Sequence, residues 1–294
     1  MKELIGVDIG GTHIKMAAFS SDGEMLATWH RETGDKPTEG VPAFAETVRQ
    51  MLREVAAPDG RIGIAAPGVA AKDGRAIAFQ AGKMHGIEGL DWTELLKRQH
   101  VVPVLNDAHA ALLGELWRGA AVGARDAILL TLGTGVGGAI LSDGRLLTGA
   151  TGRAGHLGHV SIADSDDRSI FNTPGSLEWT MGNYSVGQRS GGRFSTAREL
   201  VEAHLSGDTA ASELWLNSVR SLARAITSFI NILDPEVVII GGGIAKAGAA
   251  LFDPLARYLD DMEWRPGGHG VRIVPAALGE WAGASGAAWS AQQS

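Results

Sequence analysis

The stretch LIGVDIGGTHIK, residues 4–15, begins with an apolar run typical of a buried β-strand and turns at two glycines after Asp8. A second copy of this design lies near the middle of the chain, AILLTLGTGVGGAILSDG, residues 127–144. In both copies an alternating apolar stretch follows the glycines and ends at an Asp-Gly dipeptide, which is a β-hairpin signal. The sequence therefore predicts two glycine-turn hairpins and a protein built from two similar halves.

Outside the hairpins, segments with strand character alternate with segments that have helical spacing. The longest apolar stripe at helical spacing ends at an Asp-Pro dipeptide, and a buried-type strand follows it. We expect strands at residues 61–66, 101–105, 237–240 and 271–274, and helices at residues 41–55, 92–99, 108–116, 219–233 and 283–292. Residues 148–192 are polar and have no clear period, which is typical of a loop region that builds a site. This alternation predicts an α/β fold.

The chain of 294 residues is long enough for two domains, each with its own core. We place the boundary after Asn106, which gives an N-terminal lobe of residues 1–106 and a C-terminal lobe of residues 107–279. We expect the last helix, residues 280–294, to return to the first lobe because chain ends are often close together.

Composition limits the classes of partner. Acidic side chains number 33 and basic ones 26, so the net charge is -7, which disfavours nucleic acid and anionic membranes as partners. The sequence has no cysteine, which excludes disulfides and thiolate metal sites, and it has no signal peptide or apolar run of membrane-spanning length. We therefore expect a cytoplasmic protein that acts on a small molecule.

One glycine turn contains a motif of dinucleotide-binding proteins, but the sequence after it does not fit such a site. Residues 133–138 satisfy G-x-G-x-x-G, but a strand-turn-strand sequence follows where a dinucleotide site needs a helix, and no P-loop pattern occurs. Glycine turns can instead direct backbone N–H groups at phosphate oxygens, although a single copy would be read as an ordinary hairpin turn. Two copies favour phosphate binding. The residues expected to hold phosphate are Gly10, Gly11, Thr12, Lys15, Gly133, Thr134 and Gly135, and we expect Asp8 to hold Mg²⁺ through water.

Five segments in order, DIGGTHIK, LNDAHAALLGE, TLGTGVGGAIL, GRAGHLGH and IIGGGI, resemble the ROK family (repressor, open reading frame, kinase) over nearly the whole chain. The resemblance implies the two-lobed actin-like ATPase fold, related to ribonuclease H, with a mixed sheet flanked by helices in each lobe. It also implies a kinase that uses ATP and a sugar, and it leads us to expect a homodimer. Gly242 and Gly243 match the family's loop on the adenosine side.

Asp107 is the candidate catalytic base. It follows a predicted strand, where open α/β sheets bind ligands, and it matches the catalytic aspartate of the ROK motif. A sugar hydroxyl that attacks a phosphate needs a carboxylate to accept its proton. The alternative is that Asp107 caps the helix after it, but both roles can be filled by different oxygens, or Asn106 can be the cap.

The sugar pocket departs from the family pattern at two places. His156 stands where glutamate is usual, and Ser169, Phe171 and Ser176 stand where the family has zinc-binding cysteines. We therefore predict no structural zinc. The resemblance assigns sugar contacts to Asn106, His156, His159 and Glu178, and we add Gly68 because it permits close approach of the backbone. His156 also has a plain alternative, a partly buried histidine bonded to the backbone.

These departures leave the substrate open. We expect phosphorylation of a hexose such as glucose, at the 6-hydroxyl, whereas His156 instead of glutamate favours N-acetylmannosamine or another N-acetylhexosamine. A sugar-binding protein without catalysis is a third possibility, and polyphosphate as donor a variant of the first. A transcriptional repressor of the family is not expected because the first strand begins at Leu4, with no helix-turn-helix ahead of it.

Overall fold

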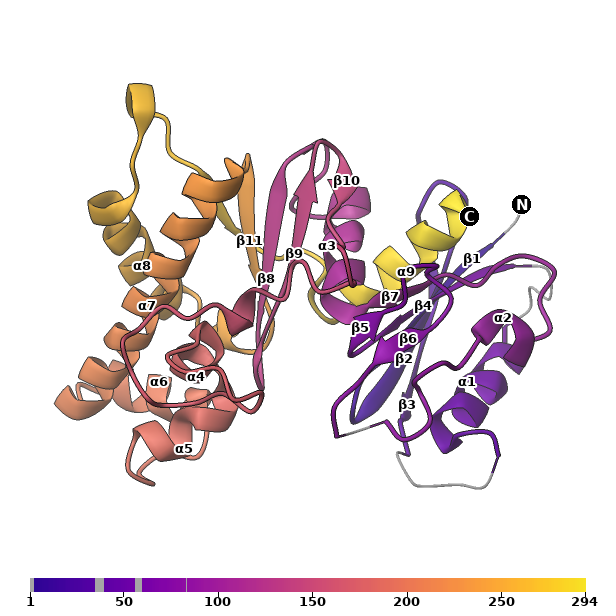
Figure 1. The fold of residues 1–294 in the computed structure, drawn as a ribbon, viewed down its shortest axis with the longest axis horizontal. Helices are drawn as coiled ribbons and strands as arrows, with labels where there is room; N and C mark the ends of the chain where they lie inside the picture. The colour runs from indigo at the N-terminus through magenta and orange to yellow at the C-terminus, as the bar shows by residue number, and fades with distance from the viewer. Residues whose placement is uncertain (1–2, 35–39, 56–59, 83) are drawn as a thin grey trace. The chain divides into compact units, whose positions relative to one another are not determined.

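A computed structural model describes residues 3–34, 40–55, 60–82 and 84–294 (Figure 1). The chain divides into two compact units. The first unit consists of Met1–Gly123, Leu147–Ala154 and Ala277–Ser294, and the second of Ala124–Leu146 and Gly155–Ala276. The boundary expected at residue 106 lies before helix α3 (Asp107–Arg118), whereas the compact units place all of α3 in the first unit, because α3 packs against the C-terminal helix α9 (Ala282–Gln293).

The first unit contains a five-stranded mixed sheet in the order β3-β2-β1-β4-β7. Its strands are β1 (Leu4–Ile9), β2 (His13–Phe19), β3 (Met25–Glu32), β4 (Arg61–Ala66) and β7 (Val104–Asn106). β1 is antiparallel to β2, as the hairpin signal predicts, and parallel to β4, which in turn is parallel to β7. The carboxyl ends of β1, β4 and β7 therefore lie at one edge of the sheet, and each is followed by a residue expected in the site.

The second unit repeats this topology in the order β10-β9-β8-β11-β12. Its strands are β8 (Ala127–Leu132), β9 (Val136–Ser142), β10 (Arg145–Leu146), β11 (Val237–Gly241) and β12 (Arg272–Pro275). β8 pairs antiparallel with β9 and parallel with β11. The two glycine-turn hairpins therefore occupy equivalent places in two sheets of the same design, which is what their similar sequences predict.

In the described residues of the first unit the helices are α1 (Ala43–Arg53), α2 (Trp92–Leu95), α3 and α9, with the short helix η5 (Gly279–Trp281) before α9. Helix α2 is shorter than residues 92–99, because Leu96 ends it and Lys97 adopts a positive φ of 51°. Figure 1 shows yellow α9 beside magenta α3, and α9 also packs on β1 and β4.

Small residues allow this close packing of α9. A side chain at Gly6 of β1 would collide with the carbonyl of Ala284, and one at Gly63 of β4 would collide with that of Ala287. Gly286 lies equally close to the carbonyl of Ala110 in α3. The alanine- and glycine-rich sequence of α9 thus fits a helix covered on several sides, at a packing density that leaves no room for larger side chains.

The helices of the second unit are α4 (Leu177–Met181), α5 (Val186–Arg189), α6 (Ala197–Leu205), α7 (Thr209–Leu233) and α8 (Ala249–Met262), with short helices η1 (Leu157–His159), η2 (Asn183–Ser185), η3 (Ile244–Ala247) and η4 (Pro266–Gly268). The stretch from residue 148 to 192 is thus less irregular than expected, since short helices occur within it. Helix α7 starts ten residues before its apolar stripe, where the Asp208 side chain accepts the Ala211 N–H at 2.9 Å. No helix in the described parts of the chain has the length and apolarity needed to span a membrane.

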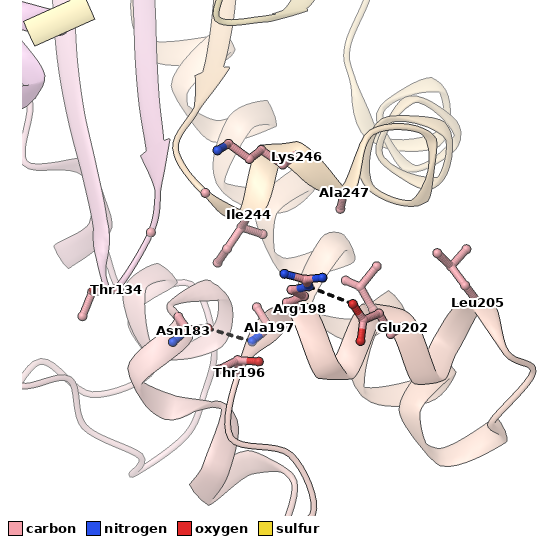
Figure 2. Close-up of a pocket in the computed structure, with 13 residues that line it drawn as sticks. Thr134, Asn183, Thr196, Ala197, Arg198, Glu202, Leu205, Ile244, Lys246 and Ala247 are labelled. Atoms are coloured by element: carbon pink, nitrogen blue, oxygen red, sulfur yellow. Dashed lines mark hydrogen bonds and ion pairs between the residues drawn. The ribbon is translucent and has the colours of Figure 1, made fainter. Parts of the chain in front are cut away.

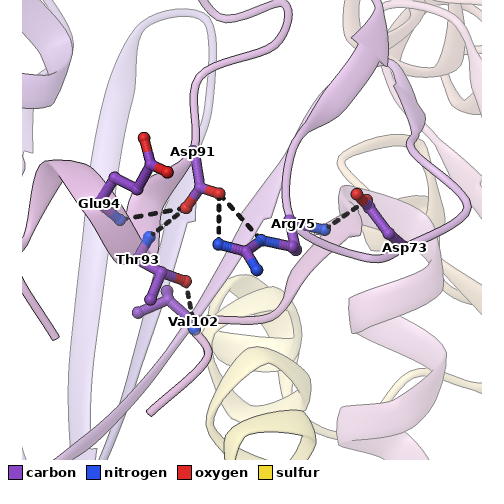
Figure 3. Close-up of polar contacts among 6 residues, drawn as sticks. All are labelled: Asp73, Arg75, Asp91, Thr93, Glu94 and Val102. Atoms are coloured by element: carbon purple, nitrogen blue, oxygen red, sulfur yellow. Dashed lines mark hydrogen bonds and ion pairs between the residues drawn. The ribbon is translucent and has the colours of Figure 1, made fainter. Parts of the chain in front are cut away.

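A small hairpin, β5 (Val69–Ala70) with β6 (Ile77–Phe79), follows Gly68 and is tied to α2. Figure 3 shows how: Arg75 donates to Asp91 at 2.9 Å, and the other carboxylate oxygen of Asp91 accepts the N–H groups of Thr93 and Glu94. Desolvation opposes ionisation of Asp91, but these N–H groups and Arg75 outweigh it and lower its pKa. The charged carboxylate therefore joins the segment after Gly68 to the rest of the first unit.

Candidate active site

Asp8 lies near the end of β1, beside the start of α9. Its Cα is paired with that of Lys15 across the hairpin, and the Lys15 ammonium lies 3.4 Å from Glu280 Oε2. A side chain at Gly283 would come within 2.7 Å of the Asp8 carboxylate, so the first turn of α9 closes over it. Asp8 is half-buried in this setting.

The electrostatics of Asp8 are unusual. Burial raises the pKa of Asp8 from 3.8 to about 7, the negative charge of Asp107 adds to the rise, and Lys15 opposes it. The carboxylates of Asp8 and Asp107, both in the first unit, therefore repel each other. A cation bound beside them would remove this repulsion, so Asp8 fits the role expected for it.

The first glycine turn is fixed by bonds to the end of β3. The Gly10 N–H donates to the His13 carbonyl at 2.9 Å, and the Thr33 hydroxyl donates to the Gly10 carbonyl at 2.6 Å. The Thr33 N–H donates to the Thr12 carbonyl at 2.9 Å. Gly11 and Thr12 remain exposed at the tip of this braced turn, where a ligand can reach their backbone.

Asn106 is the N-cap of α3, which resolves one of the alternatives left by the sequence. Its side-chain oxygen accepts the N–H groups of Ala108 at 3.0 Å and His109 at 3.1 Å. Its amide donates to the Gly68 carbonyl at 2.9 Å, so Asn106 also joins the end of β7 to the turn after β4. Gly68 has a φ of 112°, and a side chain there would meet the Phe79 carbonyl at 2.5 Å.

Asp107 is the first residue of α3 and its side chain reaches the surface. One carboxylate oxygen accepts the Ala108 N–H at 2.8 Å. Desolvation by the surrounding protein raises the pKa of Asp107, and the Ala108 N–H partly opposes this rise. A hydrogen bond with the Asn106 side chain also opposes the rise of the Asp107 pKa.

The second glycine turn, between β8 and β9, rests on η2 and α4. The carbonyls of Gly133 and Thr134 accept the N–H groups of Asn183 and Tyr184, each at 3.0 Å. Glu178 Oε2 accepts the Val136 N–H at 3.1 Å, and a side chain at Gly135 would collide with this carboxylate. The turn is therefore built around Glu178.

His156, His159 and Glu178 all belong to the second unit. The rings of His156 and His159 are nearly parallel, with centroids 6.3 Å apart, and the Phe171 ring meets that of His159 edge-on at 4.9 Å. Glu178 Oε1 and His159 Nδ1 are buried without a hydrogen-bond partner among the described residues. Two such unsatisfied polar atoms are costly unless a ligand completes them.

Serines fill two of the positions where the family has cysteines. Ser176 is the N-cap of α4 and accepts the Trp179 N–H at 3.1 Å, while the Ser169 hydroxyl accepts the N–H groups of Phe171 and Thr173. The part of the chain that the structure describes contains no group of three or more His, Asp or Glu side chains placed to hold a metal ion. The absence of a structural zinc stays a prediction, which metal analysis of the purified protein tests.

The second unit contains a pocket of about 700 Å³ beside the Gly133–Thr134 turn (Figure 2). Its lining residues are Gly133, Thr134, Asn183, Thr196, Ala197, Arg198, Val201, Glu202, Leu205, Gly243, Ile244, Lys246 and Ala247. One wall is α6, whose first N–H is held by Asn183 at 2.7 Å, and the opposite wall is η3. Val201, Leu205 and Ile244 make the interior largely apolar.

The expected site residues are divided between the two units. Asp8, Gly10, Gly11, Thr12, Lys15, Gly68, Asn106 and Asp107 belong to the first unit, and Gly133, Thr134, Gly135, His156, His159, Glu178, Gly242 and Gly243 to the second. Of the second group, the pocket collects Gly133, Thr134 and Gly243. Sequence reasoning missed the contribution of α6, whose apolar spacing at Ala197, Val201 and Leu205 marks only an ordinary amphipathic helix.

Comparisons with known proteins agree with this architecture. The model of the ROK family matches residues 4–294. A glucokinase of Thermotoga maritima is 33% identical over 97% of this chain and 96% of its own, and an N-acetylmannosamine kinase of Citrobacter koseri is 28% identical over 98% of each. A ROK family glucokinase from Streptomyces griseus, solved with glucose and AMPPNP, has a TM-score of 0.79 at 26% identity and covers 99% of this chain and 100% of its own. The chain belongs to the ROK family and is a sugar kinase with the actin-like ATPase fold.

Proposed function

We propose that this protein transfers the γ-phosphate of ATP to the 6-hydroxyl of a hexose, with glucose as the first candidate. The observation that carries the proposal is the position of Asp107, an exposed carboxylate at the first residue of α3, directly after the strand β7 and the cap residue Asn106. Glucokinase relatives at about 30% identity support glucose as substrate.

In this reaction Asp107 accepts the proton of the attacking hydroxyl. The sugar oxygen forms a bond to the γ-phosphorus, the bond to the bridging oxygen breaks, and ADP leaves with that electron pair. Desolvation raises the pKa of Asp107, which makes it a stronger proton acceptor than an ordinary carboxylate. In the first unit, the backbone N–H groups of the exposed tip at Gly11 and Thr12 would bind phosphate. In the second unit, those of the turn at Gly133 and Thr134 would do the same.

Asp8 would hold Mg²⁺ through water in the loaded enzyme. When bound, the ion supplies positive charge to the phosphates and offsets the negative charge of the site. Asp8 lies near the end of β1 under the first turn of α9, and burial and the charge of Asp107 both raise its pKa, so a nearby cation would favour its charged form.

The pocket between α6 and η3 would take the adenosine of the donor. Its volume of about 700 Å³ lies within the range of small-molecule sites, and Val201 and Leu205 offer apolar surface to a base. Polyphosphate has no apolar part that would use this wall, so the pocket favours a nucleotide as donor. Lys246 at the pocket adds a positive charge for a phosphate.

In the second unit we propose His156, His159 and Glu178 as sugar contacts. In the first unit we propose Asn106 and Gly68 for the same role. Glu178 is suited to this because Oε2 holds the phosphate-side turn while Oε1 is buried and has no described partner. A sugar hydroxyl that donates to Oε1 would satisfy it.

A second candidate substrate is N-acetylmannosamine. The observation in its favour is His156 at a position where the family usually has glutamate, because imidazole donates one hydrogen bond that a carboxylate cannot. N-acetylmannosamine kinases at 28% identity agree with it.

A coupled assay of ADP release tests both candidates. It should be run with glucose, mannose, fructose, allose and the N-acetylhexosamines, with ATP and with polyphosphate as donors. Turnover with glucose or N-acetylmannosamine is the expected result, and binding without turnover of any sugar would favour a non-catalytic protein. We also propose a cytoplasmic homodimer without a nucleic-acid partner, in line with the acidic net charge of -7, and sedimentation velocity tests the dimer.

A further inference from the structure

Glu115 of α3 is a buried carboxylate that the proposed mechanism does not use. Its side chain has no exposed surface. One carboxylate oxygen accepts the Ala120 N–H at 2.7 Å and the Ala277 N–H at 3.1 Å, and the other accepts the Leu278 N–H at 2.9 Å. A side chain at Gly119 would collide with the carboxylate, so the backbone at this point is shaped to admit it.

The three N–H groups belong to two places where the chain passes between the units. The first connection leaves the first unit after Gly123, and the last one returns to it at Ala277. Ala120 precedes the outgoing connection, whereas Ala277 and Leu278 begin the returning segment. Glu115 therefore fastens both connections to the helix that begins with Asp107.

On the far side of each connection, the second unit has its own anchors. Glu236 Oε1 accepts the N–H groups of Arg125 at 2.7 Å and Asp126 at 3.1 Å. The Ala276 N–H donates to the Ile240 carbonyl at 3.0 Å. Few residues lie between anchors. On the outgoing path these are residues 123 and 124, since the N–H groups of Ala121 and Val122 donate to the carbonyls of Glu115 and Gly119. On the return it is the single peptide link from residue 276 to 277.

Gly123 is the glycine of the outgoing path. It has a φ of 86°, and among the described residues no atom beyond its two chain neighbours lies within 4 Å of the place where a side chain would be. A hinge requires a few residues that absorb the change in φ and ψ between two anchored ends. The outgoing path has this form.

We propose that Glu115 is a positioning residue of the hinge. It holds the first outgoing and the last returning connection, two of the four crossings between the units, to the helix of Asp107. In these two connections rotation is thereby confined to Gly123 and the link between residues 276 and 277. The kinetic part of this inference rests on the proposed kinase activity. The bonds of Glu115 hold the first-unit ends of these two connections against the helix that carries the base.

The test uses the full chain with Glu115→Gln, which keeps the size of the side chain but replaces one accepting oxygen by a donor. The matched control is Glu263→Gln, because Glu263 is also a buried carboxylate, with a side chain 2% exposed, that accepts a backbone N–H from Val271 at 2.8 Å. Glu263 lies within the second unit, outside the connections.

Amide hydrogen exchange in peptides covering residues 119–123 and 276–279 is measured first, because it needs no substrate. Glu115→Gln is expected to speed exchange there at least about tenfold, and Glu263→Gln to leave it unchanged. Steady-state kinetics and calorimetric titration with ADP follow. We expect kcat to fall at least about tenfold while the Kd for ADP stays within about twofold, since the pocket of about 700 Å³ lies entirely in the second unit.

Unchanged exchange in Glu115→Gln overturns the proposal, and so does a lowered Tm with normal kcat, which is the signature of a purely structural role. A parallel loss of ADP affinity also overturns it, because it indicates general damage. If Glu115→Gln does not fold, Glu115→Asp, whose shorter carboxylate cannot span both connections, takes its place. If the wild type turns over no sugar, the proposed function fails. The exchange experiment still tests whether Glu115 holds the two connections.

Discussion

Replacing Asp8 by asparagine should make the first unit more stable at neutral pH while it abolishes kinase activity. Asparagine has nearly the same shape but cannot ionise, so it removes the charge that burial and Asp107 disfavour. The folded protein holds the Asp8 proton until about pH 7, whereas the unfolded chain releases it near the ordinary value of 3.8. As pH rises from about 4 to 7, ionisation therefore favours the unfolded state, and wild-type stability is lost over this window.

The size of the effect follows from the two pKa values. A rise from 3.8 to about 7 corresponds to about 4 kcal/mol as an upper limit, and water reaching the half-buried side chain would reduce it to about 2 kcal/mol. Asp8→Asn and wild type should have equal stability near pH 4, and the variant should be the more stable one above pH 7.

The assay is urea unfolding at pH values from about 4 to 8. Unfolding of the first unit is monitored by hydrogen exchange of β1, the buried strand that carries Asp8. Asp22→Asn is the control, because Asp22 is an exposed aspartate of the same unit. Magnesium with a nucleotide should recover part of the lost stability in the wild type and none in the variant. A stability difference that does not change with pH would show that Asp8 is not held in a protonated state, and the electrostatic reasoning would be wrong.

Three further predictions concern the base, the pocket and a structural ion pair. Asp107→Asn should lower kcat at least about a hundredfold and leave the sugar Kd nearly intact, which steady-state kinetics and titration measure; a nearly normal kcat would exclude Asp107 as the base. Val201→Asp should raise the KM for ATP at least about tenfold with little change in the sugar KM, because it places a charge in the apolar wall; equal changes in both would argue against a nucleotide there. Asp91→Asn should cost about 1 kcal/mol of stability at pH 7, because Asp91 caps α2 and binds Arg75. Because the pKa of Asp91 is lowered on folding, its contribution to stability is present at pH values above the ordinary aspartate pKa and is lost as the pH falls below it. The difference in unfolding free energy between wild type and Asp91→Asn should therefore be larger at pH 7 than at pH 3.

The repeated hairpins were predictable because their signals are local. An apolar run, a glycine turn and an Asp-Gly dipeptide lie within about twenty residues, and the structure forms β1 with β2 and β8 with β9 as expected. The same holds for β4, whose bounds, Arg61–Ala66, match the predicted strand. The shared topology of the two sheets follows from the similarity of the two sequence segments.

The pocket and the interactions of Glu115 with the two connections were not predictable in this way. The lining of the pocket unites Thr134 with Val201 and Lys246, residues that no sequence period relates, and only tertiary packing brings them together. Glu115 carries an equally weak signal, since one glutamate on a helix is read as a surface residue until its three N–H partners are known. The proton affinity of Asp8 likewise depends on α9, which is encoded at the other end of the chain.

The tight seat of α9 has a consequence for how the protein forms during synthesis. The strands β1 and β4, whose glycines receive α9, are translated early, whereas α9 is made only after every residue of the second unit. The second unit is continuous apart from the loop of residues 147–154, so it can mature while the nascent first unit still lacks one of its layers. The first unit therefore cannot be completed until the last residues of the chain have been made, although most of it is encoded before the second unit.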